Sequence, residues 1–312
     1  MKKLLLIGAA VVVGAGLYFI VGSKSEQASC ETIRVGDVGW SDNTAINALT
    51  FLSIGDALGY NIDVKVLGSP VVAKSLSTGD LDVFLDWWSP ASDGIYKKYV
   101  DDGSVEMVRI NVQGAKYTFA TTKTAYDAGL KHIKDVGQFK QQLGGKVYGI
   151  EPGNEGNSHF RKAFEKHGIT GMQVVESSEA GMLTQVNRNK DGYVVFLGWA
   201  PHWMGFLYDM EYLDGGDEWF GPGGGYTDIK TLVRKGFKQE CPNVFKYLSN
   251  VEFTLPMENE VMFKIGKEQK DPRTAAVEYL TSNPDVVEKW LKGVKTVDGE
   301  NGLEAVNSAL GI

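Results

Sequence analysis

A short apolar motif that occurs twice constrains the fold of this chain more than any other feature. Residues 83–90 read VFLDWWSP and residues 195–201 read VFLGWAP, so each copy has a tryptophan two residues before a proline. Short apolar runs are typical of buried strands, and proline rarely continues a central strand. The repeat therefore predicts two buried strands that end in an indole, the first followed by a loop at residues 86–90.

The tryptophans at these strand ends indicate a binding site, because ligands bind beyond the carboxyl ends of strands in open α/β sheets. The paired indoles, with Trp40 and Tyr117 as further candidates, predict an aromatic cage for a cation that cannot donate hydrogen bonds. In the alternative interpretation the indoles fill the core. We prefer the cage because proline, glycine and aspartate beside the indoles favour turns over core packing.

Length and composition predict a two-lobed α/β protein. The chain has 312 residues, more than one typical domain, and its 38 glycines and 43% hydrophobic residues fit a globular protein with many turns. Its net charge of -7 argues against nucleic acid or an anionic lipid surface as a partner, and suits a protein that attracts small cations.

The amino terminus predicts export. Two lysines precede an uncharged apolar run at residues 4–22, and a polar stretch follows, which is the pattern of a signal peptide. We expect residues 1–29 to be a signal peptide cleaved after Ser23, or a membrane anchor, because the run is long enough to cross a bilayer. Cys30 lacks the apolar residue three positions earlier that lipoproteins carry. The expected location is the periplasm, with anchoring through residues 4–22 as the alternative to cleavage.

Cys30 and Cys241 are the two cysteines of the chain. In an exported protein an even pair predicts a disulfide, which here would tie the start of the mature chain to a distant segment of the same lobe. Closing so long a loop is worth about 4 to 5 kcal/mol in the chain-entropy model.

Hydrophobic periodicity predicts strands and helices in alternation. Residues 31–38, 45–58 and 62–67 read as strand, helix and strand, a βαβ unit with parallel strands. Asp42, before this helix, either caps it or contacts a ligand. Further helices are expected at 71–77, 94–100, 134–143, 158–167 and 179–188, further strands at 81–85, 114–120, 146–150, 173–176 and 193–197, a glycine-rich connection at 215–225, and carboxyl-terminal helices at 243–249, 257–267, 272–281, 284–291 and 302–310.

Motifs of enzymes and metal sites are not found in the sequence. The four histidines, at positions 132, 159, 167 and 202, form no H-E-x-x-H pattern, and there is no C-x-x-C. There is also no G-x-S-x-G, no phosphate-binding loop and no dinucleotide fingerprint. We therefore expect no metal, no cofactor and no catalysis.

Seven stretches, spread over nearly the whole chain from Cys30 onward, carry a resemblance to a known family. They resemble the substrate-binding proteins of ABC importers for quaternary amines, and within these the periplasmic choline-binding group. The stretches are residues 37–42 (DVGWSD), 114–118 (GAKYT), 148–154 (YGIEPGN), 175–179 (VESSE), 196–199 (FLGW), 240–243 (ECPN) and 257–260 (MENE).

The resemblance implies a type II periplasmic binding protein fold. Each lobe would be a mainly parallel sheet flanked by helices, with the ligand in the cleft between lobes. Lobe A would comprise residues 30–118 and 221–312, and lobe B residues 119–220. The implied protein is a monomer that binds a small quaternary ammonium ligand, works with the membrane permease of an ABC importer and closes about a hinge.

The resemblance also implies the site. Its four cage aromatics, its two polar contacts and its disulfide fall on Trp40, Trp88, Tyr117 and Trp199, on Asp42 and Asn154, and on Cys30 and Cys241. Asp86 and Trp87 stand where small or amide residues are expected, and Trp203 replaces a proline, so these three are additional candidates. We expect Trp88 to form the cage wall instead of Trp87, because Trp88 and Trp199 share the same spacing to proline.

Choline is the expected ligand. A betaine carboxylate within about 4 Å of Asp42 would be repelled by roughly 1 to 4 kcal/mol, whereas a hydroxyl can donate to Asp42 and accept from Asn154. If Asp42 only caps its helix, glycine betaine or another betaine becomes the alternative. An exported enzyme acting on choline esters and a membrane-tethered sensor are the other two hypotheses.

Overall fold

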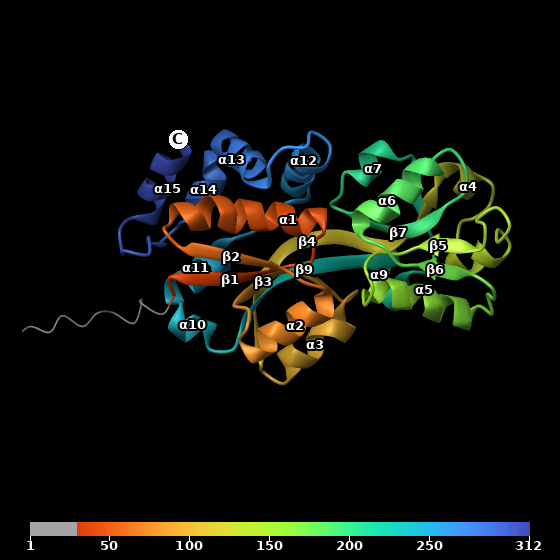
Figure 1. The fold of residues 1–312 in the computed structure, drawn as a ribbon, viewed down its shortest axis with the longest axis horizontal. Helices are drawn as coiled ribbons and strands as arrows, with labels where there is room; N and C mark the ends of the chain where they lie inside the picture. The colour runs from red at the N-terminus through yellow and green to blue at the C-terminus, as the bar shows by residue number, and fades with distance from the viewer. Residues whose placement is uncertain (1–29) are drawn as a thin grey trace, which may run out of the picture.

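The computed structural model describes residues 30–312 and shows two lobes joined by two long strands (Figure 1). The expected signal peptide or anchor at residues 1–29 lies outside the described residues. Nine strands form one continuous mixed sheet in the order β2-β1-β3-β9-β4-β7-β5-β6, with β8 paired to β4. Among residues 30–312, no helix is both long and apolar enough to span a membrane.

The first lobe begins with the predicted βαβ unit. β1 (Thr32–Asp37) pairs in parallel with β2 (Asn61–Val66) and with β3 (Val83–Ser89). The helix between β1 and β2 starts as α1 (Ser41–Asn47) and continues as the π-helical segment η2 (Ala48–Gly55). The prediction of a parallel βαβ unit at the start of the chain is confirmed.

Two strands cross between the lobes. β4 (Val105–Thr122) pairs antiparallel along its first part with β9 (Tyr226–Arg234) and along its last part with β7 (Val195–Ala200). β3 also pairs antiparallel with β9. The two-lobe α/β fold is confirmed, but the expected parallel pairing is limited to the three outer strands of each lobe, because the chain crosses twice and returns in the opposite direction.

The second lobe is smaller. β5 (Lys146–Tyr148) pairs in parallel with β6 (Gln173–Val175) and β7, and β8 (Met210–Tyr212) pairs antiparallel with β4. Its helices are α4 (Lys123–Asp127), α5 (Glu155–Lys166), α6 (Glu179–Arg188), α7 (Met204–Leu207) and α8 (Asp217–Phe220). The short α9 (Pro222–Gly225) directly precedes β9.

The helix predicted at residues 134–143 is wrong. The structure has a short 3-10 helix, η3 (Ile133–Gly137), followed by turns that end at Gly144 and Gly145, both with positive φ. His132 and Asp135 form a capping box that starts this helix. Its buried residues are Ile133 and Val136, which is the spacing of a 3-10 turn.

Helices cover both faces of the first lobe (Figure 1). On one face lie α2 (Ser69–Thr78) and α3 (Asp93–Asp101). The carboxyl-terminal helices are α10 (Phe237–Glu240), α11 (Pro242–Asn250), α12 (Leu255–Gly266), α13 (Pro272–Ser282), α14 (Pro284–Trp290) and α15 (Gly302–Leu310). The last five of these confirm the five predicted there, and four of the five have proline in the first turn, where its missing N–H costs no hydrogen bond.

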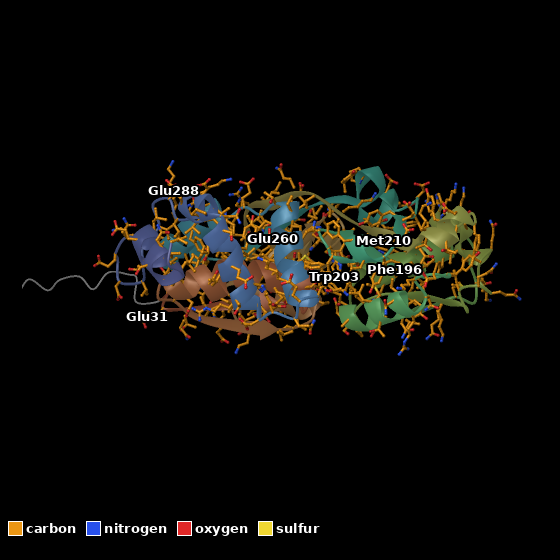
Figure 2. All side chains as sticks on the ribbon, turned by 90° about the horizontal axis from the view of Figure 1, so that it is seen from above. Glu31, Phe196, Trp203, Met210, Glu260 and Glu288 are labelled. Carbon is orange, nitrogen blue, oxygen red and sulfur yellow. A yellow bond between two sulfur atoms is a disulfide. The ribbon has the colours of Figure 1, made fainter. Side chains whose placement is uncertain are left out.

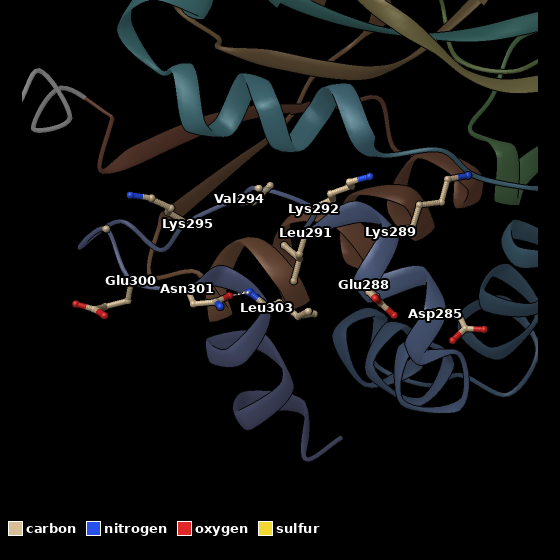
Figure 3. A pocket seen from close by; sticks show the side chains of 12 residues that line it. Asp285, Glu288, Lys289, Leu291, Lys292, Val294, Lys295, Glu300, Asn301 and Leu303 are labelled. Carbon is tan, nitrogen blue, oxygen red and sulfur yellow. Dashed lines mark hydrogen bonds between the residues drawn. The ribbon is translucent and has the colours of Figure 1, made fainter.

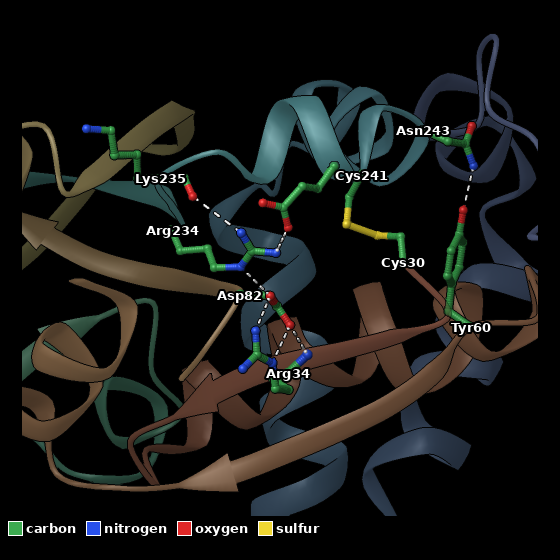
Figure 4. The surroundings of a disulfide bond; sticks show 9 residues. Cys30, Arg34, Tyr60, Asp82, Arg234, Lys235, Cys241 and Asn243 are labelled. Carbon is green, nitrogen blue, oxygen red and sulfur yellow. Dashed lines mark hydrogen bonds and ion pairs between the residues drawn. A yellow bond between two sulfur atoms is a disulfide. The ribbon is translucent and has the colours of Figure 1, made fainter. Parts of the chain in front are cut away.

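The predicted disulfide between Cys30 and Cys241 is present, and it ties the segment before β1 to the start of α11 (Figure 4). Beside it, Asp82 accepts hydrogen bonds from the guanidinium groups of Arg34 and Arg234, at 2.7 Å each. Burial alone would raise the pKa of Asp82, but these two arginines outweigh burial and hold the pKa below its usual range. The disulfide and this ion-pair cluster together fix the outer end of the first lobe.

Candidate ligand-binding site

Side chains of both lobes line a cavity between them. Five of the six residues that the resemblance implies for the site line it, together with two that the sequence did not indicate. The lining residues are Trp40, Asp42, Trp88, Tyr117 and Trp199, with Ser92 and Ile150.

Trp88 reaches this cavity from within a strand. The predicted loop at residues 86–90 is wrong, because β3 continues through Trp88, which pairs with Ile229 of β9. A register shift between Phe84 and Trp87 marks a β-bulge, which re-aims the side chains that follow it. Trp199 likewise lies inside β7, and the prolines after both tryptophans follow cis peptide bonds.

Trp87 and Trp88 lie on opposite faces of β3, as successive residues of a strand do. The ring of Trp88 faces Tyr117, with ring centroids 6.0 Å apart. The ring of Trp87 faces away from the cavity, 6.4 Å from Tyr96 and with the Lys230 ammonium 4.6 Å above it. The geometry therefore agrees with the choice of Trp88 for the cavity wall, and Trp87 is a buried packing residue.

Tyr117 and Trp199 are cross-strand partners. They pair directly between β4 and β7, and their rings meet nearly at right angles with centroids 6.1 Å apart. Tyr117 thus contacts the tryptophans of both copies of the repeated motif, Trp88 from one lobe and Trp199 from the other. These three rings form a continuous aromatic wall.

Trp40 and Asp42 enter the cavity from the start of α1. Gly39, with a φ of 79°, turns the chain out of β1, and Trp40 is the residue that precedes the helix. Asp42 lies in the first turn and its side chain caps no helix, so the interpretation of Asp42 as an N-cap is wrong. Because its carboxyl group lines the cavity, Asp42 is available to a ligand.

Asn154 lies behind Tyr117 and does not line the cavity. The Tyr117 hydroxyl donates to Asn154 Oδ1 at 2.9 Å, and the Gly156 N–H donates to the same oxygen at 2.8 Å. Asn154 is therefore the N-cap of α5, and it also holds the Tyr117 ring in place. Its amide nitrogen donates to Glu151 Oε1 at 3.4 Å.

Three buried carboxyl groups, of Asp42, Asp86 and Glu258, meet beneath the cavity. Within the described residues, neither side-chain oxygen of Asp42 or Glu258 has a hydrogen-bond partner of good geometry, and one oxygen of Asp86 has none. Burial raises the pKa of all three groups well above the usual range, and the carboxyl groups of this cluster raise one another further. A bound cation would relieve this cost, so the cluster favours a positively charged ligand.

Glu258 was not singled out from the sequence. It lies within residues 257–260, one of the stretches that carry the resemblance, but the sequence gives no sign that this glutamate is fully buried in α12. Its burial follows from the packing of α12 on α1, which brings it beside Asp42. Only the tertiary structure reveals that contact.

Hydrogen bonds across the cleft hold the lobes together around the cavity. The Trp40 indole N–H donates to Glu151 Oε2 at 2.9 Å. Ser41 donates to Glu179 through its backbone N–H at 2.8 Å and through its hydroxyl at 2.7 Å. Within the second lobe, His202 Nε2 lies 2.9 Å from Oε1 of the same Glu179. The sequence analysis missed Glu151 and Glu179 as functional residues, although both lie in stretches that carry the resemblance.

Trp203 lies at the junction of the lobes, next to the end of α12 (Figure 2). A side-chain carbon built on Gly266 would come 2.6 Å from the Trp203 indole nitrogen, so the ring packs directly against this glycine. The Lys267 ammonium lies 5.1 Å from the ring centroid. Trp203 is therefore a contact between lobes and does not line the cavity.

Another hollow of the described residues has a different character. The one beside α14 and α15 is wide and open, and its lining of lysine, glutamate, aspartate and aliphatic residues contains no aromatic ring (Figure 3). Within residues 30–312, no group of three or more His, Cys, Asp or Glu side chains is arranged to hold a metal ion.

Comparison with known proteins gives consistent matches. The family model of the substrate binding domain of the ABC-type glycine betaine transport system matches residues 31–282. A solved ABC-transporter choline binding protein in complex with choline is 49% identical, with a TM-score of 0.88 over 90% of this chain and 99% of that chain. An ABC-transporter choline binding protein in an unliganded semi-closed conformation is also 49% identical, with a TM-score of 0.83 over 91% and 100%. The glycine betaine/carnitine transport binding protein of Listeria monocytogenes is 33% identical over 184 residues, 58% of each chain.

Proposed function

The chain belongs to the family of substrate-binding domains of ABC-type glycine betaine transport systems, and on that premise we propose that it captures choline between its lobes and delivers it to an ABC importer. The observation that carries the proposal is the cavity itself. Three tryptophans and one tyrosine surround it, and the buried carboxyl group of Asp42 lines it. A trimethylammonium group cannot accept or donate hydrogen bonds, so aromatic faces, worth up to about 2 kcal/mol each, are the groups that recognise it.

The charges around the cavity favour choline over a betaine. Asp42, Asp86 and Glu258 contribute carboxyl groups, and the lining contains no lysine or arginine to receive a ligand carboxylate. A choline hydroxyl can donate to Asp42, whereas a betaine carboxylate would face it with like charge. The similarity to a choline-bound relative supports the same choice.

Glycine betaine is the second candidate. The matching family model is described for glycine betaine transport, and the Listeria relative is a glycine betaine/carnitine binding protein. A betaine would bind well if Asp42 were protonated in the complex, because a carboxylic acid donates a hydrogen bond to a carboxylate.

Calorimetric titration of choline and glycine betaine into the wild type and Asp42→Asn, at one salt concentration, tests the proposal. We expect tighter choline binding by the wild type, and a smaller gap in Asp42→Asn, chiefly through improved betaine binding. Tighter betaine binding by the wild type would contradict the choline assignment while leaving the aromatic cage intact.

We propose that lobe A comprises residues 30–118 with 221–312 and that lobe B comprises residues 119–220, with the hinge in β4 and next to β9. The change of partner along β4 supports these boundaries, because Lys116 is the last residue paired with β9 and the first paired with β7. Ligand would then bridge the lobes, with Trp40, Asp42 and Trp88 on one side, Trp199 on the other and Tyr117 next to the hinge between them. Asn154 would act from behind Tyr117, through its hydrogen bond with the tyrosine hydroxyl.

Members of this family are transport proteins that work outside the cytoplasm. For this chain we propose further that it is a monomer, that it docks on a membrane permease and not on nucleic acid, and that it turns over no substrate. Incubation with acetylcholine tests the last point, and release of more than one equivalent of product would contradict it. Intact-mass analysis of the exported protein tests whether residues 4–22 are retained as an anchor.

A further inference from the structure

The three tryptophans of the cavity differ in what their indole N–H groups bind. Trp88 donates to Asp86 Oδ1 at 2.8 Å, and Trp40 donates to Glu151 Oε2 at 2.9 Å. The indole N–H of Trp199 has no partner within the described residues. Two of the three indole rings thus donate a hydrogen bond from their N–H edge to a carboxyl group.

The bond between Trp88 and Asp86 is built into β3. Residues two apart in a strand project from the same face, so the strand itself places Asp86 next to Trp88. Asp86 is 1% exposed, and Trp88 supplies the hydrogen bond that its carboxyl group receives in this structure, since its other oxygen has none. The Trp40 bond, in contrast, crosses the cleft and depends on how the lobes are arranged.

A carboxylate at this position is unexpected. Asp86 is buried, and burying a carboxyl group without a cationic partner is costly. Within the described residues no lysine or arginine forms an ion pair with Asp86. A cation held against the face of Trp88 would supply the missing positive charge.

A hydrogen bond from an indole to a carboxylate also strengthens the ring as a cation receptor. A bound cation favours the ionised form of Asp86, and this anion draws the N–H proton and makes the π face more negative. The ring then attracts a cation more strongly, but not a neutral group of the same shape. The hydrogen bond thus helps the cavity to recognise the charge of a ligand, whereas the shape of the cavity recognises only the size of the ligand.

We propose that Asp86 is a specificity-determining residue which, through the indole N–H of Trp88, makes the cavity select the positive charge of its ligand and not only its methylated shape. The inference rests on the proposed function in taking quaternary ammonium compounds as the ligand class. It does not depend on whether the physiological ligand is choline or a betaine.

The test compares cations with a neutral isostere in wild type and Asp86→Asn. The probes are choline, tetramethylammonium and 3,3-dimethyl-1-butanol, in which carbon replaces the choline nitrogen. We expect Asp86→Asn to weaken both cations about tenfold and the neutral alcohol less than about twofold, because the asparagine side chain still accepts from Trp88 but carries no charge. Equal losses for all three probes would show a structural role and overturn the proposal.

Two controls separate the proposal from its alternatives. Asp37→Asn removes another buried carboxyl group of the same lobe, one that accepts from Gly39 and Asn47 and not from an indole, so it should leave the cation selectivity unchanged. The second control introduces Asp86→Asn into Trp88→Phe, which lacks the indole N–H. There the substitution should weaken cation binding much less than it does in the protein with Trp88. An undiminished loss there would show that Asp86 acts as a plain buried charge and would overturn the role of Trp88.

The outcomes for the function and for Asp86 are distinguishable. If choline fails to bind the wild type while tetramethylammonium binds, the choline assignment is wrong and Asp86 is judged on tetramethylammonium. If the neutral alcohol does not bind the wild type measurably, the two aspartate variants are compared on the cations alone. A tenfold loss of cation affinity in Asp86→Asn with no loss in Asp37→Asn supports the role of Asp86, and equal losses in both variants contradict it. If neither cation binds, both proposals are contradicted.

Discussion

The carboxyl group of Glu155, in the first turn of α5, lies against Gly94 of α3 across the junction of the lobes. A side-chain carbon built on Gly94 would overlap it. Burial is the main cause that raises the pKa of Glu155 to about 7, Asp93 adds to it, and Lys162 together with the backbone N–H groups of Gly94 and Ile95 opposes it. The contact between α5 and α3 is therefore sensitive to pH in the neutral range.

The first prediction concerns that pH dependence. The closed protein keeps the Glu155 proton up to about pH 7, whereas an opened or unfolded chain loses it near 4.5. The contribution of Glu155 to closure is thus complete below the lower pKa and is lost as pH rises through about 7. We expect Glu155→Gln to bind more tightly than the wild type at about pH 8 and similarly at about pH 5, measured by calorimetry. The same affinity difference between the two proteins at both pH values would contradict the role of Glu155. Titration of the buried Asp42 and Asp86 affects both proteins alike and does not change this comparison.

A second prediction follows from the lack of space at Gly94. Gly94→Ala should displace the flexible Glu155 side chain from the junction without unfolding the protein, and so should flatten the Glu155-dependent part of the pH profile. Gly68→Ala is the matched control, because a side-chain carbon at Gly68 of the same lobe meets nothing within 4 Å. If Gly94→Ala keeps the pH profile of the wild type, the added methyl group does not displace the Glu155 carboxyl group and the prediction is wrong.

The third prediction separates the two adjacent tryptophans. Trp88→Ala should weaken ligand binding by more than about 1 kcal/mol, because Trp88 lines the cavity. Trp87→Ala should leave the affinity within a few-fold but lower the free energy of unfolding by about 3 to 5 kcal/mol, because Trp87 is a buried packing residue. Titration and chemical denaturation of both variants check this, and equal losses of affinity would mean that the wall is misassigned.

The fourth prediction concerns the contact of Ser41 with Glu179. Ser41→Ala removes the hydroxyl that donates to Glu179 at 2.7 Å across the cleft but keeps the backbone N–H that donates to it at 2.8 Å. We expect ligand release, followed by stopped-flow tryptophan fluorescence, to become about tenfold faster, because a hydrogen bond to a charged group is worth about 1.5 to 3 kcal/mol. Ser249→Ala, which removes a hydroxyl bond within α11, should leave the release rate unchanged.

The fifth prediction concerns the disulfide. Its two cysteines are 211 residues apart, so the double substitution Cys30→Ser with Cys241→Ser should lower the free energy of unfolding by about 5 kcal/mol in the chain-entropy model. Ligand affinity should stay within about twofold, because neither cysteine lines the cavity. Denaturant unfolding beside titration checks both statements, and a large loss of affinity in a folded double variant would show that the first lobe is reshaped.

The sequence predicted those parts of the fold in which the buried face is apolar. The repeated motif indicated β3 and β7, and helical spacing indicated the five carboxyl-terminal helices. It missed β9 because the inward positions of that strand include Thr227 and Thr231, both buried, instead of aliphatic residues. Thr231 is accommodated there because it accepts a hydrogen bond from Asn111, a partner 120 residues away in sequence.

A buried polar residue also explains the error at residues 86–90. An aspartate in an apolar run normally marks the end of a buried strand, but Asp86 remains buried in β3 with a hydrogen bond from Trp88. Trp88 and Trp199 were predictable because their spacing to proline repeats, whereas the cage roles of Trp40 and Tyr117 came from the resemblance. Glu151, Glu179 and Glu258 were not predictable, because glutamates are common on protein surfaces and only the packing of distant elements buries Glu179 and Glu258 and brings all three to the site.

The continuity of β4 between the lobes has a consequence for the order of events during capture. Tyr117 and Trp199 are partners in adjacent hydrogen-bonded strands, so a rotation of the lobes leaves that pair assembled, whereas Trp88 travels with β3. An arriving ligand would thus meet a preformed half-receptor and acquire its remaining walls only afterwards. The concentration-dependent encounter and the later enclosure would then be separate kinetic steps, and a bound ligand could leave only after the enclosure reopens.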